Sequence, residues 1–260
     1  MTDRKMWKTG LSFGMLTEEK LEKAAIAGLD LVEISGIDDP ANWEKVPEWE
    51  AKTGVKVWSF HLPFCWKRHP FADPTADNEE DWKESLDRYV PCIEGCGKAG
   101  IKHMVIHPSR EPFKDEEREK YMNLAIKRLK ILSDICKENG CVLCVEDLPR
   151  TCLGRDSDEM LRFMETNPDL RICFDVNHLL REDHVEFIQK VGKYIVTTHI
   201  SDYDFVDERH LFPMQGQINW RKLQSALELV DFKGPFLYET MSMGHVWADV
   251  KKNHEYLKNL

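Results

Sequence analysis

The sequence predicts a single α/β domain folded as a (β/α)8 TIM barrel, in which eight parallel strands form a cylinder surrounded by helices. The chain has 260 residues, close to the roughly 250 that are typical of this architecture. Short runs rich in β-branched and aromatic residues alternate with longer amphipathic segments, a pattern typical of a parallel sheet. No linker, repeat or low-complexity tract divides residues 1–260, so we expect one domain. An open doubly wound sheet is the main alternative.

The expected strands are short and mostly apolar, and each is followed by a segment with helix signals. Their number, eight, favours closure into a barrel at this chain length. In order along the chain they are LSFGM from Leu11, LDLVEIS from Leu29, VKVWSFHLPF from Val55, HMVIHPS from His103, CVLCVEDL from Cys141, LRICFDVNH from Leu170, IVTTHISD from Ile195 and GPFLYET from Gly234.

The helix signals between these runs are caps and amphipathic periods. Thr17 is followed by Glu18 and Glu19, as at a capped helix start, and residues 115–139 form a long amphipathic segment that ends at Gly140. A further helix is expected from Ser157. The irregular stretches 66–78 and 203–217 each follow a strand. In a barrel such loops border the active site.

The charge balance is acidic, with 36 Lys and Arg against 46 Asp and Glu and a formal net charge of −10. Nucleic-acid binders usually need a basic face to neutralise phosphates, so no nucleic-acid partner is expected. The first ten residues contain no apolar run of signal-peptide length, and no stretch approaches the ~20 apolar residues of a membrane span. We therefore expect a protein that is not bound to membranes.

The cysteines indicate a reduced compartment. Eight cysteines in a chain of this length are not needed as a disulfide scaffold, and we expect free thiols and a cytoplasmic location. Cys141 and Cys144 have the spacing of a zinc knuckle. Residues three apart on a strand point to opposite faces, however, so a structural zinc at this pair is not expected.

Ionisable residues gather where the expected strands end. In a barrel these ends surround one axis, and several buried carboxylates there would be costly without a cation. We therefore expect at least one divalent metal. The strand-end residues are Glu33, His61, His107, Glu146, Asp175, His178, His199, Asp202 and Glu239.

The ligand types leave the metal open. Three carboxylates with one imidazole would form a hard, mostly oxygen site suited to Mn²⁺, Mg²⁺ or Co²⁺, with Mn²⁺ preferred. A histidine-rich site built from His61, His107 and His210 would instead favour Zn²⁺.

An ordered set of motifs resembles the xylose isomerase-like TIM barrel superfamily, which includes sugar-phosphate isomerases and epimerases and the AP endonuclease family 2 relatives such as endonuclease IV. The resemblance spans residues 11–240. The motifs are FHLPF (60–64), IHPS (106–109), VEDLPRTCLG (145–154), CFDVNH (173–178), HISD (199–202), DERH (207–210) and YET (238–240).

The resemblance implies roles at matching positions. Glu146, Asp175, His199 and Glu239 match the four metal ligands shared by the isomerases and epimerases. His178 matches a histidine that contacts the substrate in those enzymes. Position 152 is Cys, where the family's epimerases carry a second glutamate.

In the nuclease branch further metals are bound at matching positions. His61 and His107 would join Glu146 around a second metal. His178, Glu208 and His210 would hold a third, although residue 208 is Glu where the nuclease pattern has Asp, and Asp147 stands where Asn is expected.

The expected function is a sugar or sugar-derivative isomerase or epimerase that depends on a divalent metal. Glu146 and Glu239 would move a proton next to a carbonyl, and the metal would lower the cost of the enediolate charge. Substrate contacts are expected from His61, His107, His178, Glu208 and His210, from Arg209 as a clamp for an oxyanion or phosphate, from Trp66 as a stacking side chain, and from Glu33 at the pocket floor. The last three have structural alternatives: a surface ion pair of Arg209 with Asp207 or Glu208, packing of Trp66 on the barrel edge, and a helix cap at Glu33.

Other functions remain open at this stage. A lyase or dehydratase acting on a keto-sugar or keto-cyclitol could use the same metal and base, since an enediolate can expel a β-leaving group. An endonuclease IV-like nuclease and a non-enzymatic role are further alternatives. The expected partner is a small carbohydrate, and a homo-oligomer is possible because barrels of this kind often form dimers or tetramers.

Overall fold

The fold is a closed parallel barrel in which the strands follow one another in sequence order, from β1 to β8. In this computed structural model the described residues are 7–64, 72–111, 114–240 and 247–260. Strand β1 pairs with both β2 and β8, which closes the cylinder. The strands are Thr9–Leu16 (β1), Leu31–Ile37 (β2), Lys56–His61 (β3), His103–Ile106 (β4), Val142–Glu146 (β5), Arg171–Asp175 (β6), Ile195–Ile200 (β7) and Phe236–Tyr238 (β8).

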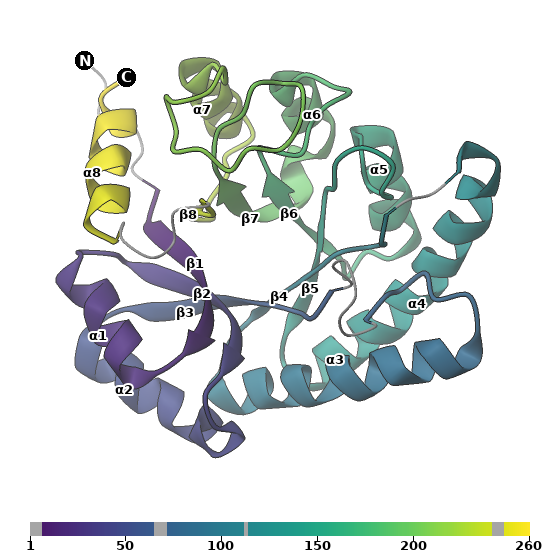
Figure 1. The fold of residues 1–260 in the computed structure, drawn as a ribbon, viewed down its shortest axis with the longest axis horizontal. Helices are drawn as coiled ribbons and strands as arrows, with labels where there is room; N and C mark the ends of the chain where they lie inside the picture. Colours follow the sequence, from purple (N-terminus) through teal and green to yellow (C-terminus); the bar gives the residue numbers. More distant parts are fainter. Residues whose placement is uncertain (1–6, 65–71, 112–113, 241–246) are drawn as a thin grey trace.

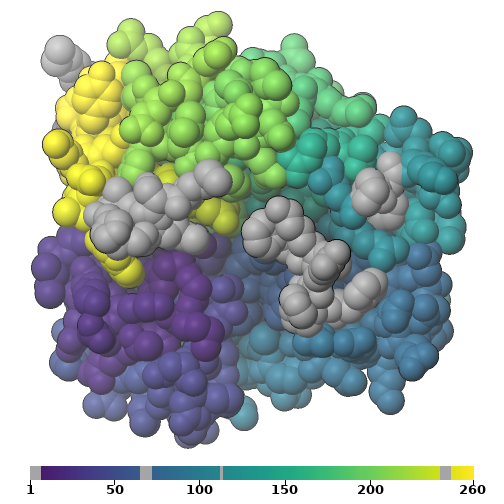
Figure 2. Space-filling model, in the orientation of Figure 1, coloured from purple at the N-terminus to yellow at the C-terminus, as the bar shows by residue number. Residues whose placement is uncertain are grey.

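Helices surround the barrel, and the chain runs around it in sequence order, as the colours of Figures 1 and 2 show. The α-helices are Glu18–Ile26 (α1), Val46–Thr53 (α2), Glu79–Ala99 (α3), Arg118–Glu138 (α4), Ser157–Thr166 (α5), His184–Val191 (α6), Trp220–Leu229 (α7) and Trp247–Lys258 (α8). Short 3₁₀ helices are Pro40–Lys45 (η1), Asp115–Glu117 (η2) and Gly192–Tyr194 (η3). Within the described residues no helix is both long and apolar enough to cross a membrane.

The eight-stranded barrel predicted from the sequence is confirmed, with shorter strands than expected at the site end. Strand β3 ends at His61 and β4 at Ile106. Pro63 and Pro108 follow these ends, and proline cannot donate a ladder hydrogen bond. The predicted helix start at Thr17 is also confirmed, since its hydroxyl accepts a hydrogen bond from the amide of Lys20 at 3.2 Å.

The barrel interior is packed in layers, and the site residues form the layer above an apolar one. Val105, Cys144 and Cys173 form a buried cluster inside the barrel. Side chains alternate between the two faces of a strand, so the next inward residues on the same strand paths are His107, Glu146 and Asp175. Cys144 lies in this interior cluster, whereas the thiol of Cys141 contacts the carbonyl of Ile101. The prediction that these two cysteines face apart is therefore confirmed.

Two irregularities in strand register align residues that form the site. Between β2 and β3 the pairing passes from Val32–Val57 to Glu33–Ser59, so that Trp58 is skipped. Between β6 and β7 it passes from Ile172–Ile195 to Cys173–Thr197, which brings Asp175 level with His199. Bulges of this kind re-aim side chains and are common next to active sites.

Candidate metal centre

The ionisable residues predicted at the strand ends converge at one end of the barrel. Three groups each offer ligand atoms that lie within 4.8 Å of one another. Two of the groups share Glu146, and the third adjoins Asp175. They meet because β3 to β8 are consecutive neighbours in the closed sheet. The groups are Glu146, Asp175, His199 and Glu239; His61, His107 and Glu146; and His178, Glu208 and His210.

The first set, which we call the four-ligand group, is built around His199. Its Nδ1 lies 3.1 Å from Glu146 Oε1, 3.0 Å from Glu239 Oε2 and 3.8 Å from Asp175 Oδ2. Glu146, Asp175 and His199 are almost completely buried, and Glu239 is partly exposed.

A divalent cation fits the four-ligand group. The buried Asp175 Oδ2 has no hydrogen-bond partner among the described residues, and its nearest histidine nitrogens are His178 Nε2 at 3.4 Å and His199 Nδ1 at 3.8 Å. Three carboxylates and one imidazole nitrogen, with ligand atoms this close, are the donors that a hard or borderline divalent metal takes.

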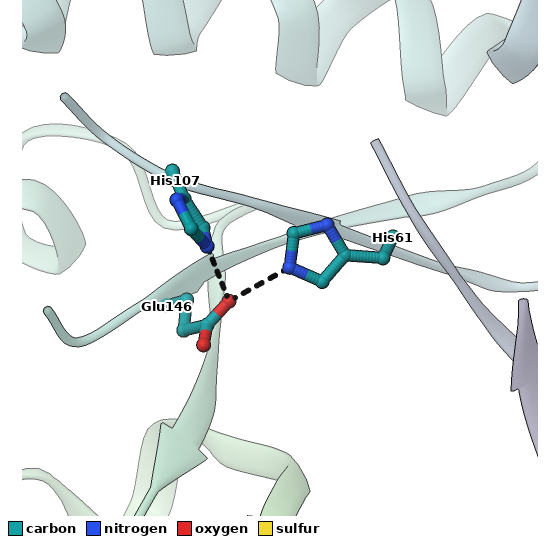
Figure 3. A group of neighbouring side chains, drawn as sticks. All are labelled: His61, His107 and Glu146. Atoms are coloured by element: carbon teal, nitrogen blue, oxygen red, sulfur yellow. Dashed lines mark hydrogen bonds and ion pairs between the residues drawn. The ribbon is translucent and has the colours of Figure 1, made fainter. Parts of the chain in front are cut away.

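The second set, the two-histidine group, shares Glu146 with the first. Figure 3 shows His61 and His107 approaching the same carboxylate. Their Nε2 atoms lie 3.1 and 3.3 Å from Glu146 Oε2, whereas His199 contacts Oε1. The two oxygens of Glu146 therefore face two different groups, an arrangement that suits a carboxylate shared between adjacent cation sites.

The third set, the rim group, is held by a neighbouring arginine. Glu208 Oε2 lies 3.1 Å from His178 Nε2 and 3.8 Å from His210 Nε2. Its other oxygen accepts a hydrogen bond from Arg150 Nη2 at 2.7 Å. His178 Nε2 also lies 3.4 Å from Asp175 Oδ2, so the rim group adjoins the four-ligand group.

The buried carboxylates and histidines of the metal-free cluster shift one another's pKa. Burial raises the pKa of Glu146, but the nearby His199 and His107 lower it by more, so that the pKa of this carboxyl lies well below its usual range. Burial lowers the pKa of His61, but its hydrogen bond to Glu146 and the charge of that group raise it to about 9. The pKa of Asp147 is raised well above its usual range, chiefly by burial. Protonated His61 thus pairs with ionised Glu146, and a cation bound at Glu146 would compete with that proton.

The loop between β7 and α7 carries most of the rim group and is ordered by Asp202. Its Oδ1 accepts hydrogen bonds from the amides of Tyr203 and Ile218, and its Oδ2 accepts from the amide of Met214 and from Trp220 Nε1, at 2.8–3.1 Å. This buried carboxylate therefore organises the loop rather than joining the ligand groups, and the predicted irregular stretch 203–217 borders the site.

The comparisons with known proteins agree with this geometry. Residues 21–260 match the family model described as xylose isomerase-like TIM barrel.

The chain belongs to this family.

Among curated relatives, the chain is 28% identical over 149 residues to the uncharacterized protein MJ1614 of Methanocaldococcus jannaschii, covering 57% of this chain and 59% of that relative. It is 25% identical over 203 residues to the uncharacterized protein MJ1311 of the same organism, covering 73% and 67%. The chain thus spans less than two thirds of the length of MJ1614.

Solved structures share the fold. A D-tagatose 3-epimerase-like protein superposes with a TM-score of 0.83 at 23% identity, covering 97% of this chain and 96% of the other. The 3-keto-D-glucoside 4-epimerase YcjR of E. coli gives 0.77 at 17% identity, with 98% and 100% covered. A D-psicose 3-epimerase gives 0.77 at 14% identity, with 97% and 96% covered.

Within this family barrel, two residues expected at the substrate have other contacts. Glu33 is completely buried, and its carboxylate binds Ser12, Ser59 and His199. Glu33 was expected at the pocket floor, but it lies beneath His199 and has no access to a substrate. Arg209 is 46% exposed and pairs with Asp204 at 2.8 Å. Trp66 lies outside the described residues.

Sequence reasoning missed Arg150 and Phe64. Arg150 binds Glu111, Asp207 and Glu208 and so joins three loops at the barrel mouth. The ring of Phe64 lies 4.4 Å from that of His107. Both residues fall inside motifs that carry the family resemblance, but nothing in their own spacing indicated these contacts.

Proposed function

We propose that the chain is a divalent-metal-dependent isomerase or epimerase of a sugar or sugar derivative. One observation carries the proposal. Glu146 ends β5 and Glu239 follows β8, and their carboxylates approach the same His199 nitrogen, at 3.1 and 3.0 Å. Two carboxylates from β5 and from the end of β8 therefore lie close enough to act on one substrate. The names of the structural neighbours, which include a D-tagatose 3-epimerase-like protein, a D-psicose 3-epimerase and a keto-glucoside 4-epimerase, support the same class.

The metal would be held by Glu146, Asp175, His199 and Glu239, with Mn²⁺ as the preferred ion. When bound, it supplies positive charge that lowers the cost of an enediolate at the substrate's carbonyl and hydroxyl oxygens. One of Glu146 and Glu239 removes the proton next to the carbonyl, and the other returns it from the opposite face or to the adjacent carbon. Such positioned acid–base groups contribute about 10²–10⁴-fold in rate.

The remaining polar residues would grip the substrate. His61 and His107 line one side of Glu146, and His178, Glu208 and His210 line the other side through Asp175. Phe64 beside His107 adds an apolar surface at the mouth, suited to the C–H face of a sugar. Arg209 is exposed enough to reach a phosphate or an oxyanion.

The test is a deuterium-exchange screen. The protein, loaded with Mn²⁺ and then in parallel with Mg²⁺, Co²⁺ or Zn²⁺, is incubated in D₂O with a panel of keto-sugars and keto-cyclitols. We expect deuterium at a carbon beside the carbonyl, with no leaving group released. Glu146→Gln and Glu239→Gln should each lower this exchange by about 10²–10⁴-fold, and Glu255→Gln on α8 should leave it unchanged.

Other outcomes contradict the proposal in distinct ways. Release of a leaving group would show that the protein is a lyase or dehydratase. No retained metal, together with no activation by any of the four ions, would overturn metal dependence itself.

A second candidate, cleavage of a phosphoester by several metals, is favoured by one specific observation. The two-histidine group and the rim group flank the four-ligand group, which matches the ligand pattern of the nuclease branch. Against it stands the net charge of −10, which is unfavourable for binding a polyanion. Metal analysis showing more than one ion per chain, with salt-dependent binding of abasic duplex DNA, would support this candidate over the isomerase.

A further inference from the structure

Glu33 lies in the barrel interior directly beneath His199. It comes from β2, is fully buried, and accepts a hydrogen bond from His199 Nε2 at 2.8 Å through Oε1. The hydroxyl of Ser12 donates to the same oxygen at 3.0 Å, and the hydroxyl of Ser59 donates to Oε2 at 2.6 Å. Three donors from three strands thus hold the carboxylate in one orientation.

This contact decides which nitrogen of His199 faces the four-ligand group. Because Nε2 carries the hydrogen donated to Glu33, the lone pair in the neutral imidazole is on Nδ1. Nδ1 is also the atom that lies 3.1 Å from Glu146 and 3.0 Å from Glu239. The ligating atom is therefore fixed by a partner on the far side of the ring.

Three other histidines of the ligand groups have the opposite ring orientation. His61, His178 and His210 each place Nε2 toward a carboxylate of the cluster, and each has Nδ1 at a backbone carbonyl oxygen. The carbonyl partners are those of Leu62 at 3.0 Å, Asp147 at 2.8 Å and Glu239 at 3.3 Å. Among these four histidines, only His199 has a carboxylate, that of Glu33, as the hydrogen-bond partner of the ring nitrogen that faces away from the ligand groups.

The register of the barrel places Glu33 for this contact. The skipped residue Trp58 brings Glu33 level with Ser59. Trp58, the extra residue, donates from its indole Nε1 to Thr197 Oγ1 at 3.2 Å, and the bulge leaves Ser59 as the residue level with Glu33. The bulge, the two serine hydroxyls and the complete burial together indicate a dedicated support for His199.

We propose that Glu33 is a positioning residue that sets the metal affinity of the four-ligand group by orienting His199 and increasing the basicity of its Nδ1. This inference rests on the proposed metal centre. A carboxylate behind a ligating histidine fixes the ring and its tautomer, and loss of such a partner typically weakens metal binding by about 10–100-fold.

The test measures metal binding without any substrate. Zn²⁺ affinity is determined by competition with a chromophoric chelator for the wild type, Glu33→Gln and Glu182→Gln. Glutamine keeps the size of the side chain but removes its charge, and we expect affinity to fall by about 10–100-fold in Glu33→Gln. Glu182 is also a mostly buried carboxylate, at 8% exposed, and it binds Ser157 and Lys190. The same change at Glu182 should leave affinity within about twofold, since neither of these partners belongs to a ligand group.

Two further measurements keep the outcome clear. Ser59→Ala removes one donor to Glu33 and should weaken affinity severalfold, which tests the proposal if Glu33→Gln does not fold. The ¹⁵N spectrum of His199 in the Zn²⁺-loaded wild type should show the metal on Nδ1 and the hydrogen on Nε2.

Each result has one meaning. If the wild type binds metal and Glu33→Gln binds it with the same affinity, the role of Glu33 is overturned and the proposed function stands. Where Glu33→Gln does not fold, an unchanged affinity in Ser59→Ala has the same meaning. Metal on Nε2 has the same consequence. A wild-type protein that binds none of the divalent ions overturns the proposed function and the role of Glu33 together.

Discussion

The four-ligand group and the rim group differ in what holds them in place. Glu146, Asp175 and His199 are 0–1% exposed and sit on strands of the closed sheet. Glu208 and His210 are 28% and 23% exposed and lie in the loop between β7 and α7. These three strand members of the four-ligand group, which we call the deep group, are therefore positioned by strand register, whereas Glu208 and His210 depend on contacts between loop side chains.

This difference suggests a division of labour. Sites on strands are held more precisely than sites on loops, so the deep group suits a bound metal and the proton transfers. Loop residues can be rearranged without disturbing the barrel, so the rim group suits substrate selection. Arg150 illustrates the second case, because it reaches Glu111, Asp207 and Glu208 from a backbone with φ of 54°, a conformation that costs energy for a non-glycine residue.

The largest effect should follow from changing the carboxylate that two groups share. Glu146→Gln removes the charge facing both His199 and the two-histidine group, so exchange activity should fall by about 10²–10⁴-fold. It should also abolish stabilisation by metal. At a metal concentration of about 100 times the dissociation constant, the wild type should gain about 2.7 kcal/mol, seen as a rise of several degrees in the unfolding midpoint.

Glu208→Gln is the matched change in the rim group. It should keep most of the metal-induced rise, because Glu208 is not in the four-ligand group. Thermal unfolding of both variants with and without Mn²⁺ compares them directly. If Glu146→Gln keeps the rise and Glu208→Gln loses it, the metal binds at the rim and the division of labour is wrong.

The sequence was a good guide to the deep group for a simple physical reason. Inward positions on a strand repeat every second residue, and parallel strands present their carboxyl ends at one face. The placement of Glu146, Asp175 and His199 near one another therefore follows from the strand assignments alone, and Glu239 follows from its place after β8.

The remaining contacts depended on features that a single sequence does not reveal. Glu33 reaches its place because the register skips Trp58, and bulges leave no clear mark in an apolar run. Arg150 has its role because three loops meet around it. Such contacts join residues far apart in the chain, so local patterns do not predict them.

A smaller effect is expected from loosening the rim. Arg150→Ala removes the guanidinium that donates to Asp207 at 2.6 Å and Glu208 at 2.7 Å. The KM of the substrate identified by the exchange screen should rise by about tenfold, equivalent to about 1.4 kcal/mol, with a smaller change in kcat. Arg150→Lys should recover only part of this, because an ammonium cannot reproduce the forked contacts of a guanidinium.

Arg162→Lys is the control for this change. Arg162 makes a paired contact with Glu119, at 2.8 and 2.9 Å, on the outer helices, so its substitution should leave both kinetic constants unchanged. An unchanged KM in Arg150→Ala would mean that the rim does not select the substrate.

The smallest effect concerns the pH dependence of stability at the rim of the metal-free protein. Burial lowers the pKa of His210, but its interaction with Glu208 and the charges of Asp175 and Glu239 raise it to about 9. A raised histidine pKa stabilises the fold fully below the ordinary value of about 6.5 and loses this contribution as the pH rises through about 9. The free energy of unfolding lost in His210→Gln should therefore be on the order of 1 kcal/mol near pH 6, given screening of a partly exposed pair. Urea unfolding in the presence of a chelator should show this loss shrinking toward zero above pH 9. A loss that stays constant across this range would show that His210 contributes by packing and not through its charge.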